Sequence, residues 1–154
     1  MNVFRSVARL LIVVSLAAGC SASYSTPASP SGSGWPAITA GQLAGTWNLL
    51  SIQPTGEAEQ ATPVGARYTS TFADGRLSTR VDCNTCSGVF AVSGQTLTAG
   101  PALGCTRVAC ATMAFENVYT SLLGGDSTVA LSGGTLVLSS ARGMLRFTRE
   151  FGPI

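Results

Sequence analysis

Residues 67–82 read RYTSTFADGRLSTRVD, and this stretch decides the class of fold. It consists of two strand-like segments, residues 67–73 and 76–82, which flank Asp74-Gly75. Glycine at this position accepts the positive φ that a tight turn between antiparallel strands requires. The stretch therefore predicts a β-hairpin.

Short strand-like segments, bounded by turn residues, continue on both sides of this hairpin. In the last of them Leu145 and Phe147 face one side while Arg146 and Thr148 face the other, the alternation of a half-buried strand. The further strands are expected at residues 46–52, 88–92, 96–98, 127–131, 135–139 and 144–149.

One segment follows a helical period instead. Its apolar residues fall at i, i+3, i+4, i+7 and i+8, the stripe of an amphipathic helix, and Gly124-Gly125 supplies a stop. These residues are Phe115, Val118, Tyr119, Leu122 and Leu123. The sequence thus predicts a mostly β fold, either a small antiparallel β-barrel or a strongly curled sheet, with one α-helix at about residues 112–123 covering an opening.

The N-terminus has the composition of an export signal. Arg5 and Arg9 precede an apolar run at residues 10–18, and small residues lead directly to Cys20. The run is roughly half of the about 20 apolar residues that a membrane-spanning helix needs. We therefore expect residues 1–19 to be a signal peptide.

The cleavage site resembles the lipobox of bacterial lipoproteins, although Ala17 stands where leucine is commonest. The resemblance implies that Cys20 is lipidated and that the membrane is a partner through this anchor. It places the protein in the cell envelope, on the outer membrane facing the periplasm in a diderm cell and on the outer face of the plasma membrane otherwise. The alternative is an ordinary secretory signal with a coincidental cysteine.

Residues 20–42 are expected to form the lipidated cysteine and a tether, because Ser, Ala, Pro and Gly dominate and cannot bury a core. One domain then follows at residues 43–150. Without the signal peptide seven arginines face seven acidic residues, so the mature chain is formally neutral. Since no basic run exists, nucleic acid is a poor candidate partner.

Four further cysteines, Cys83, Cys86, Cys105 and Cys110, form a C-x₂-C and a C-x₄-C. Two disulfides are favoured in an oxidising compartment, in the nested pairing Cys83–Cys110 and Cys86–Cys105 that antiparallel neighbouring segments would align. A Cys₄ zinc site and a redox-active C-x-x-C remain as alternatives. We expect neither a metal nor a cofactor.

Three stretches resemble the META domain (HslJ-like) family over residues 43–149. They are LAGTW at residues 43–47, Asp82-Cys83-Asn84 followed by Gly88, and TRVAC at residues 106–110 with Glu116 beyond. The resemblance implies a lipocalin-like β structure with a helix, in envelope lipoproteins linked to heat or antibiotic stress, with no established catalytic mechanism. Cys86 and Cys105 depart from the family pattern and suit a second disulfide.

The motif side chains have structural explanations as well as functional ones. Trp47 is expected to be a core aromatic, and Asn84 and Thr106 to hydrogen-bond backbone at turns. Glu116 is expected to pair with a buried arginine or a backbone amide, with a binding role as the alternative.

The chain contains no histidine, no close acidic cluster and no phosphate-binding loop, so we expect no catalysis. The leading hypothesis is a non-catalytic, stress-associated envelope protein that contacts an unidentified envelope protein. A carrier of a small apolar ligand is one alternative, because lipocalin-like barrels can enclose a ligand. An inhibitor of secreted proteases is another, because GTW also occurs in small barrel inhibitors. A carrier should be hollow, whereas a contact protein should have a filled interior and an exposed apolar patch.

Overall fold

The computed structural model describes residues 36–149. The predicted signal peptide, Cys20 and most of the predicted tether lie outside the described residues. Within them, no helix combines the length and the hydropathy that crossing a membrane would require.

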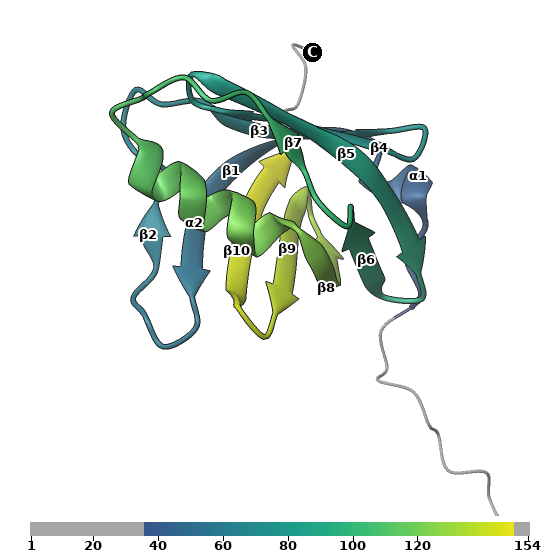
Figure 1. Cartoon of the computed structure of the whole chain (residues 1–154). Helices are drawn as coiled ribbons and strands as arrows, with labels where there is room; N and C mark the ends of the chain where they lie inside the picture. The colour runs from purple at the N-terminus through teal and green to yellow at the C-terminus, as the bar shows by residue number, and fades with distance from the viewer. Residues whose placement is uncertain (1–35, 150–154) are drawn as a thin grey trace, which may run out of the picture. The chain divides into compact units, whose positions relative to one another are not determined.

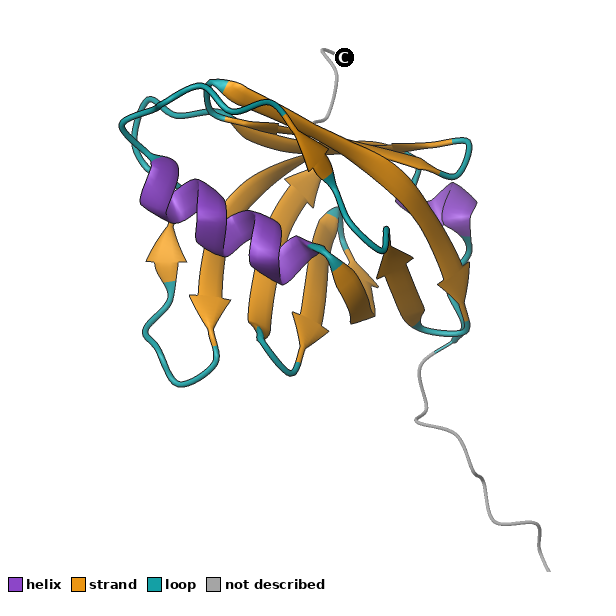
Figure 2. Cartoon of the chain, in the orientation of Figure 1, coloured by secondary structure: helices purple, strands orange, loops and turns teal. Residues whose placement is uncertain are grey.

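Eight antiparallel strands of the described part close into a β-barrel (Figures 1 and 2). The sheet runs in the order β10-β9-β8-β6-β5-β4-β3-β1 and closes where β1 pairs with β10. The strands of the barrel are β1 (Gly45–Pro54), β3 (Tyr68–Ala73), β4 (Arg76–Val81), β5 (Asn84–Ser93), β6 (Thr96–Ala99), β8 (Gly125–Ser132), β9 (Thr135–Ser140) and β10 (Gly143–Arg149). The prediction of a mostly β fold is confirmed, and the closed barrel decides between the two forms expected.

The predicted hairpin is formed by β3 and β4, which pair from Tyr68 opposite Val81 to Ala73 opposite Arg76. Asp74 and Gly75 both have positive φ, 49° and 72°. Two positive φ values in a two-residue loop match the twist of the flanking strands, which explains why Asp-Gly stands here.

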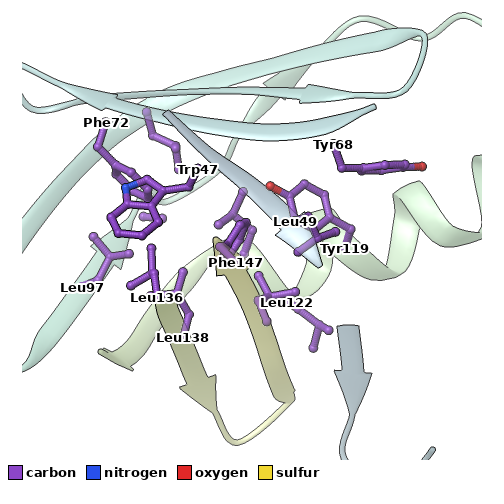
Figure 3. Close-up of a cluster of buried hydrophobic side chains, with 14 of the residues drawn as sticks. Trp47, Leu49, Tyr68, Phe72, Leu97, Tyr119, Leu122, Leu136, Leu138 and Phe147 are labelled. Carbon is purple, nitrogen blue, oxygen red and sulfur yellow. The ribbon is translucent and has the colours of Figure 1, made fainter. Parts of the chain in front are cut away.

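Alternation sorts the side chains of the barrel wall. In β4, Leu77, Thr79 and Val81 are buried while the residues between them are exposed. Large side chains from all round the wall meet inside (Figure 3). Those that are less than 2% exposed include Trp47, Phe72, Ile52, Leu97, Leu136, Leu138, Leu145 and Phe147. The interior is therefore packed with aromatic and aliphatic groups.

The helix α2 (Met113–Leu123) lies across one side of the barrel (Figure 1). Its inward face buries Tyr119, Leu122 and Leu123, and the ring of Tyr119 meets that of Tyr68 edge-on at 5.5 Å. It ends at Gly124, as its sequence predicts, and begins one residue later than expected.

Closure depends on β1, which is long enough to pair with β3 along one edge and with β10 along the other. Its first residues pair with β3, and Trp47 to Pro54 pair with β10. A register shift between Leu49 and Ser51 bends the strand there. The bulged residue Leu50 consequently points outward and is 45% exposed.

Three short elements have no counterpart in the sequence prediction: α1 (Ala40–Leu43), β2 (Gln60–Ala61) and β7 (Gly104–Cys105). A capping box between Thr39 and Gln42 starts α1, and Leu43 is fully buried. The backbone N–H of Ile38 donates to the Gly94 carbonyl at 2.9 Å. The part of the chain that contacts the barrel thus begins several residues before the expected boundary at residue 43.

The strand β5 begins at Asn84, four residues before the segment predicted at residues 88–92. Its first residues, Asn84 to Ser87, are polar or cysteine and show no apolar alternation. They are held by pairing with β4 on one side and with β7 on the other.

Candidate functional site

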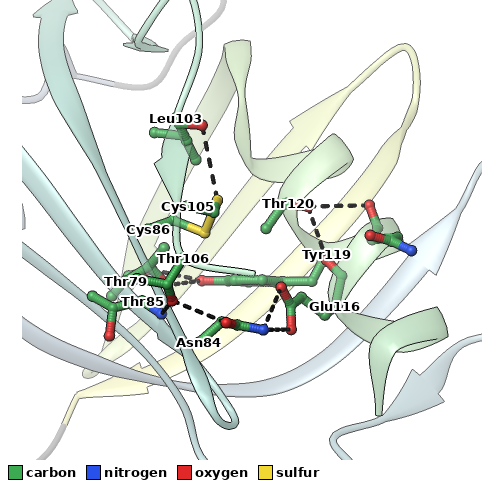
Figure 4. Close-up of a disulfide and its surroundings, with 12 residues drawn as sticks. Thr79, Asn84, Thr85, Cys86, Leu103, Cys105, Thr106, Glu116, Tyr119 and Thr120 are labelled. Carbon is green, nitrogen blue, oxygen red and sulfur yellow. Dashed lines mark hydrogen bonds between the residues drawn. A yellow bond between two sulfur atoms is a disulfide. The ribbon is translucent and has the colours of Figure 1, made fainter. Parts of the chain in front are cut away.

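Three of the predicted motif residues, Asn84, Thr106 and Glu116, come together in the structure. They lie where the turn between β4 and β5 meets the loop that leads into α2 (Figure 4). We call this region the clasp and define it as residues 82–86, residues 105–112 and Glu116.

The two segments of the clasp run antiparallel, and each residue of 82–86 is tied to the segment opposite. The end nearest β7, the inner end, is joined by the Cys86–Cys105 disulfide. Next come two hydrogen bonds of 3.0 Å between Thr85 and Thr106, and then the hydrogen bonds between Asn84 and Val108. The outer end is joined by the Cys83–Cys110 disulfide and by a hydrogen bond of 2.6 Å from Thr112 to Asp82. The disulfide pairing is therefore the nested one of the three possible.

These links explain the unequal spacing of the two cysteine pairs. At the inner end Cys86 and Cys105 are opposite each other in the β5–β7 ladder. Beyond β7 the segment leaves the sheet, so it uses more residues than β5 to cover the same length. A C-x₂-C on the strand consequently faces a C-x₄-C on the loop.

Asn84 is the centre of the clasp and is only 1% exposed. Its Oδ1 accepts the N–H of Val108 at 2.7 Å and the hydroxyl of Thr106 at 2.9 Å. Its Nδ2 donates to the carbonyl of Val108 at 2.9 Å and to the Glu116 carboxylate at 3.0 Å. A side-chain amide has two donor hydrogens and two acceptor lone pairs, so all its hydrogen-bonding capacity is used.

Glu116 is buried at 5% exposure on the inward face of α2. Its partner is the Asn84 side chain, so neither a buried arginine nor a backbone amide takes the position expected. The contact joins the first turns of the helix to β5. As predicted, the side chains of Asn84 and Thr106 hydrogen-bond the backbone: Asn84 accepts the N–H of Val108 and Thr106 accepts the N–H of Thr85.

A second polar contact ties the loop to β3. The Tyr68 hydroxyl donates to Thr112 Oγ1 at 3.1 Å, and Thr112 donates in turn to Asp82. Burial raises the pKa of Tyr68 above its ordinary value. Sequence reasoning missed this chain of contacts, because Tyr68, Asp82 and Thr112 come from three separate segments.

A third contact lies deeper and joins the Tyr119 side chain of α2 to β3 and β4. The Tyr119 hydroxyl shares hydrogen bonds with Ser70 at 2.7 Å and with Thr79 at 2.8 Å, and all three residues are 0% exposed. Burial raises the pKa of Tyr119 to about 12, while the two hydroxyl partners act in the opposite direction.

The remaining motif residues, Trp47 and Gly88, make no hydrogen bond within the clasp. Trp47 is 0% exposed, and its indole N–H donates to the Leu43 carbonyl at 2.8 Å. The Arg149 guanidinium lies 4.6 Å from the centre of its ring, a cation–π contact. Gly88 allows Leu103 to approach β5, since a Cβ at Gly88 would lie 2.8 Å from Leu103 Cδ2.

The polar groups and cysteines of the clasp join its two segments and α2 to one another. The Asn84 amide binds both the Thr106 hydroxyl and the Glu116 carboxylate. All four cysteines are in disulfides, so they supply no thiolate for zinc. Cys83 and Cys86 have different partners, so the C-x-x-C is not a redox pair. Across residues 36–149, no three His, Cys, Asp or Glu side chains are grouped to hold a metal ion.

Two of the hollows among the described residues are open depressions on the surface. One of about 510 Å³ lies beside α1 and the β8–β9 turn, lined by residues that include Gln42, Trp47, Gly133 and Arg149. Another of about 480 Å³ lies beside α2, lined by residues that include Pro54, Val118 and Arg142. The first hollow is lined in part by Trp47 and the second by Leu122, both of which are buried core residues.

Comparisons with known proteins agree with this architecture. Residues 41–151 match the family model of the META domain. The solved structure titled "NMR structure of the protein from Burkholderia xenovorans" is 24% identical with a TM-score of 0.62, over 82% of this chain and 98% of that one. A second NMR structure is 25% identical with a TM-score of 0.58, over 73% and 95%. No curated protein matches the chain.

Proposed function

Because the chain belongs to the META domain family, we propose that it is a non-catalytic, lipid-anchored protein of the bacterial cell envelope that acts through contacts with other molecules. We also propose that the protein is associated with stress, and this part rests on the family resemblance alone.

The observation that carries the non-catalytic part is the use of the polar motif residues inside the fold. Asn84 satisfies its full hydrogen-bonding capacity within the clasp, and Glu116 and Thr106 are bound to it. A catalytic acid or nucleophile needs a free side for substrate. Because these three residues join α2 to the sheet, their role is structural, and this supports a non-catalytic function.

The packed interior favours contacts over ligand carriage. A site for a small apolar ligand needs an internal volume of about 300 Å³ or more. Trp47, Phe72 and Phe147 project into the barrel interior and are 0% exposed (Figure 3). The large exposed apolar side chains, Leu50, Val64, Val89 and Val108, do not come from one strand or one loop. The exposed apolar patch expected of a contact protein is therefore not formed by a single strand or loop.

The lipid anchor rests on the sequence. Small residues lead into Cys20 after a short apolar run, and a single acyl chain anchors only marginally, whereas several on one cysteine attach a protein stably. The mature chain is formally neutral, so lipid rather than charge would hold it at the membrane. Ser21 in the second mature position favours the outer membrane where the cell has one.

The experiment is an intact mass of the protein extracted from its own membrane under native conditions. We expect the mass of residues 20–154 plus acyl groups and minus the four hydrogens of two disulfides. The Cys20→Ser variant is the matched control and should lose both the acyl mass and the membrane fraction. An unmodified Cys20 in the wild type would contradict the anchor.

The same measurement tests the alternatives. A small molecule that stays bound in the native spectrum would replace the contact proposal by a carrier function. If the anchored protein carries no such mass, in-membrane crosslinking in unstressed and in heat- or antibiotic-stressed cells should give a discrete adduct. A crosslink pattern that is the same for wild type and a misfolded variant would contradict specific contacts.

A further inference from the structure

The two disulfides of the clasp differ in their access to solvent. Cys83 is exposed in the turn between β4 and β5, and its partner Cys110 is half-buried. Cys86 is 0% exposed within β5, and its partner Cys105, which is half-buried like Cys110, is held opposite it by the β5–β7 ladder, so the two bonds differ in the exposure of Cys83 and Cys86. Thiol–disulfide exchange begins when a thiolate reaches a disulfide sulfur, so access decides which bond reacts.

We propose that the Cys83–Cys110 disulfide is a reversible thiol-exchange site whose reaction partner is a dithiol reductant, a molecule or protein with two neighbouring thiols. A thiolate of the reductant attacks the exposed Sγ of Cys83 and forms a mixed disulfide. The electron pair of the broken S–S bond leaves on Cys110 Sγ, which takes up a proton. The second thiol then attacks the reductant's own sulfur in the mixed disulfide, so Cys83 leaves as a thiol. Two electrons pass to the protein, and the reductant ends as a disulfide.

The surroundings accommodate the reduced pair in place. The carbonyl oxygen of Val108 lies 3.8 Å from Cys83 Sγ and 3.4 Å from Cys110 Sγ, so both new thiols have an acceptor within reach. Asn84 Nδ2 lies 3.4 Å from Cys110 Sγ and Glu116 Oε2 lies 3.9 Å from it. The sulfur that leaves thus lies beside the Asn84 amide and has the Glu116 carboxylate as a further acceptor for its proton.

Reduction would loosen one segment and leave the barrel closed. Residues 106–112 have no helix or strand, and the Cys83–Cys110 bond is the covalent tie at their far end. Without it, the links from Val108 to Asn84 and from Thr112 to Asp82 are hydrogen bonds that open locally at a lower free energy than the core. The segment leads directly into α2, so its opening would reach the first turn of the helix.

The inner bond does not share this behaviour. Cys86–Cys105 lies within a strand pair and stays in place when the outer bond is cut, so β5 keeps its neighbour (Figure 4). The inference does not depend on the lipid anchor, and its failure would leave the proposed envelope location untouched.

The test is a redox titration of the oxidised full-length protein with Cys20 blocked by alkylation beforehand. Reduced and oxidised dithiothreitol are mixed in graded ratios, free thiols are trapped with N-ethylmaleimide, and peptides are mapped by mass. We expect labels on Cys83 and Cys110 at a reductant ratio at least about tenfold below that for Cys86 and Cys105. Equal titration of the two bonds would overturn the proposal.

Amide hydrogen exchange of the half-reduced protein tests the consequence. Exchange over residues 106–112 should rise at least about tenfold while β5 and β10 keep their protection. The double variant Cys83→Ser/Cys110→Ser should reproduce this pattern, and Cys86→Ser/Cys105→Ser is the matched control. If the wild-type titration yields a half-reduced form with unchanged exchange, or the control opens the same segment, the proposal is wrong. The wild-type titration decides even if a variant fails to fold.

Discussion

The side chain of Asn84 replaces a stretch of backbone pairing. Its amide group offers a donor and an acceptor to the N–H and carbonyl of Val108, as an opposite strand residue would, and it also reaches Glu116. Such a saturated buried amide tolerates little chemical change, because every altered atom leaves a buried partner unsatisfied.

We expect Asn84→Asp to lower the free energy of unfolding by about 3–5 kcal/mol at pH 7. Aspartate has no N–H to donate to Val108, and its carboxylate would face that of Glu116. Urea unfolding at pH 7 measures this.

Asn117→Asp is the matched control, because this substitution makes the same change of charge at an exposed position of α2. It should change the free energy of unfolding by less than about 0.5 kcal/mol. Equal effects of the two substitutions would show that the clasp does not depend on the amide of Asn84.

Tyr119 makes the stability of the protein sensitive to alkaline pH. Burial raises its pKa to about 12, whereas an unfolded tyrosine titrates near pH 10, about two units lower. Above pH 10 the unfolded state therefore loses this proton first. The free energy of unfolding should fall as pH rises toward 12, by up to about 1.4 kcal/mol per unit for this group.

Tyr119→Phe should cost about 1 kcal/mol at pH 7, because Ser70 and Thr79 keep the 3.2 Å hydrogen bond between them. Between pH 10 and 11 the variant should lose less stability than the wild type. Tyr68 is present in both proteins, so its own raised pKa cancels in the comparison. Parallel pH profiles of urea unfolding would contradict the assignment.

At the scale of elements, the closure of the barrel depends on the turn between β9 and β10. Gly143 has φ 145° and lies opposite Pro54 of β1. A Cβ at this position would overlap the Gln53 carbonyl oxygen and lie 2.8 Å from Pro54 Cα. Both obstacles are backbone, which cannot move aside without separating the closing strands.

Gly143→Ala should therefore cost about 3 kcal/mol or more, measured by urea unfolding. Gly133→Ala is the control: Gly133 also has positive φ, 55°, but a Cβ there meets nothing within 4 Å. We expect it to cost about 1–2 kcal/mol from backbone strain alone. If both variants lose the same amount, close approach of β1 does not limit this position.

At the scale of the whole molecule, a filled barrel should bind no small apolar guest until a side chain is removed. Leu138→Ala, at a position 1% exposed, should cost about 2–5 kcal/mol and leave a cavity that takes up xenon. Shifts of core methyl signals under xenon pressure measure this. Val64→Ala, at a fully exposed position, is the control. Xenon shifts of equal size in the wild-type core would indicate a hollow barrel and favour a carrier.

The sequence by itself determined the features that depend on neighbouring residues. Asp74-Gly75 indicated the first hairpin because its φ preferences act within the turn. The spacing of Phe115, Tyr119 and Leu122 indicated α2 because helix faces repeat every three to four residues. The motifs LAGTW, Asp82-Cys83-Asn84 and TRVAC indicated the family from the sequence alone.

Only the tertiary structure decided which distant residues meet. Closure brings Trp47 opposite Arg149, and Asn84 finds Glu116 across 32 residues of chain. Neither contact has a local signal, because each depends on the curvature and register accumulated over the whole sheet. The start of β5 also lacks a local signal, so the sequence predicted it at residue 88 although the strand begins at Asn84. Its first residues have no apolar alternation, and their strand conformation comes from the neighbours that the barrel places on both sides.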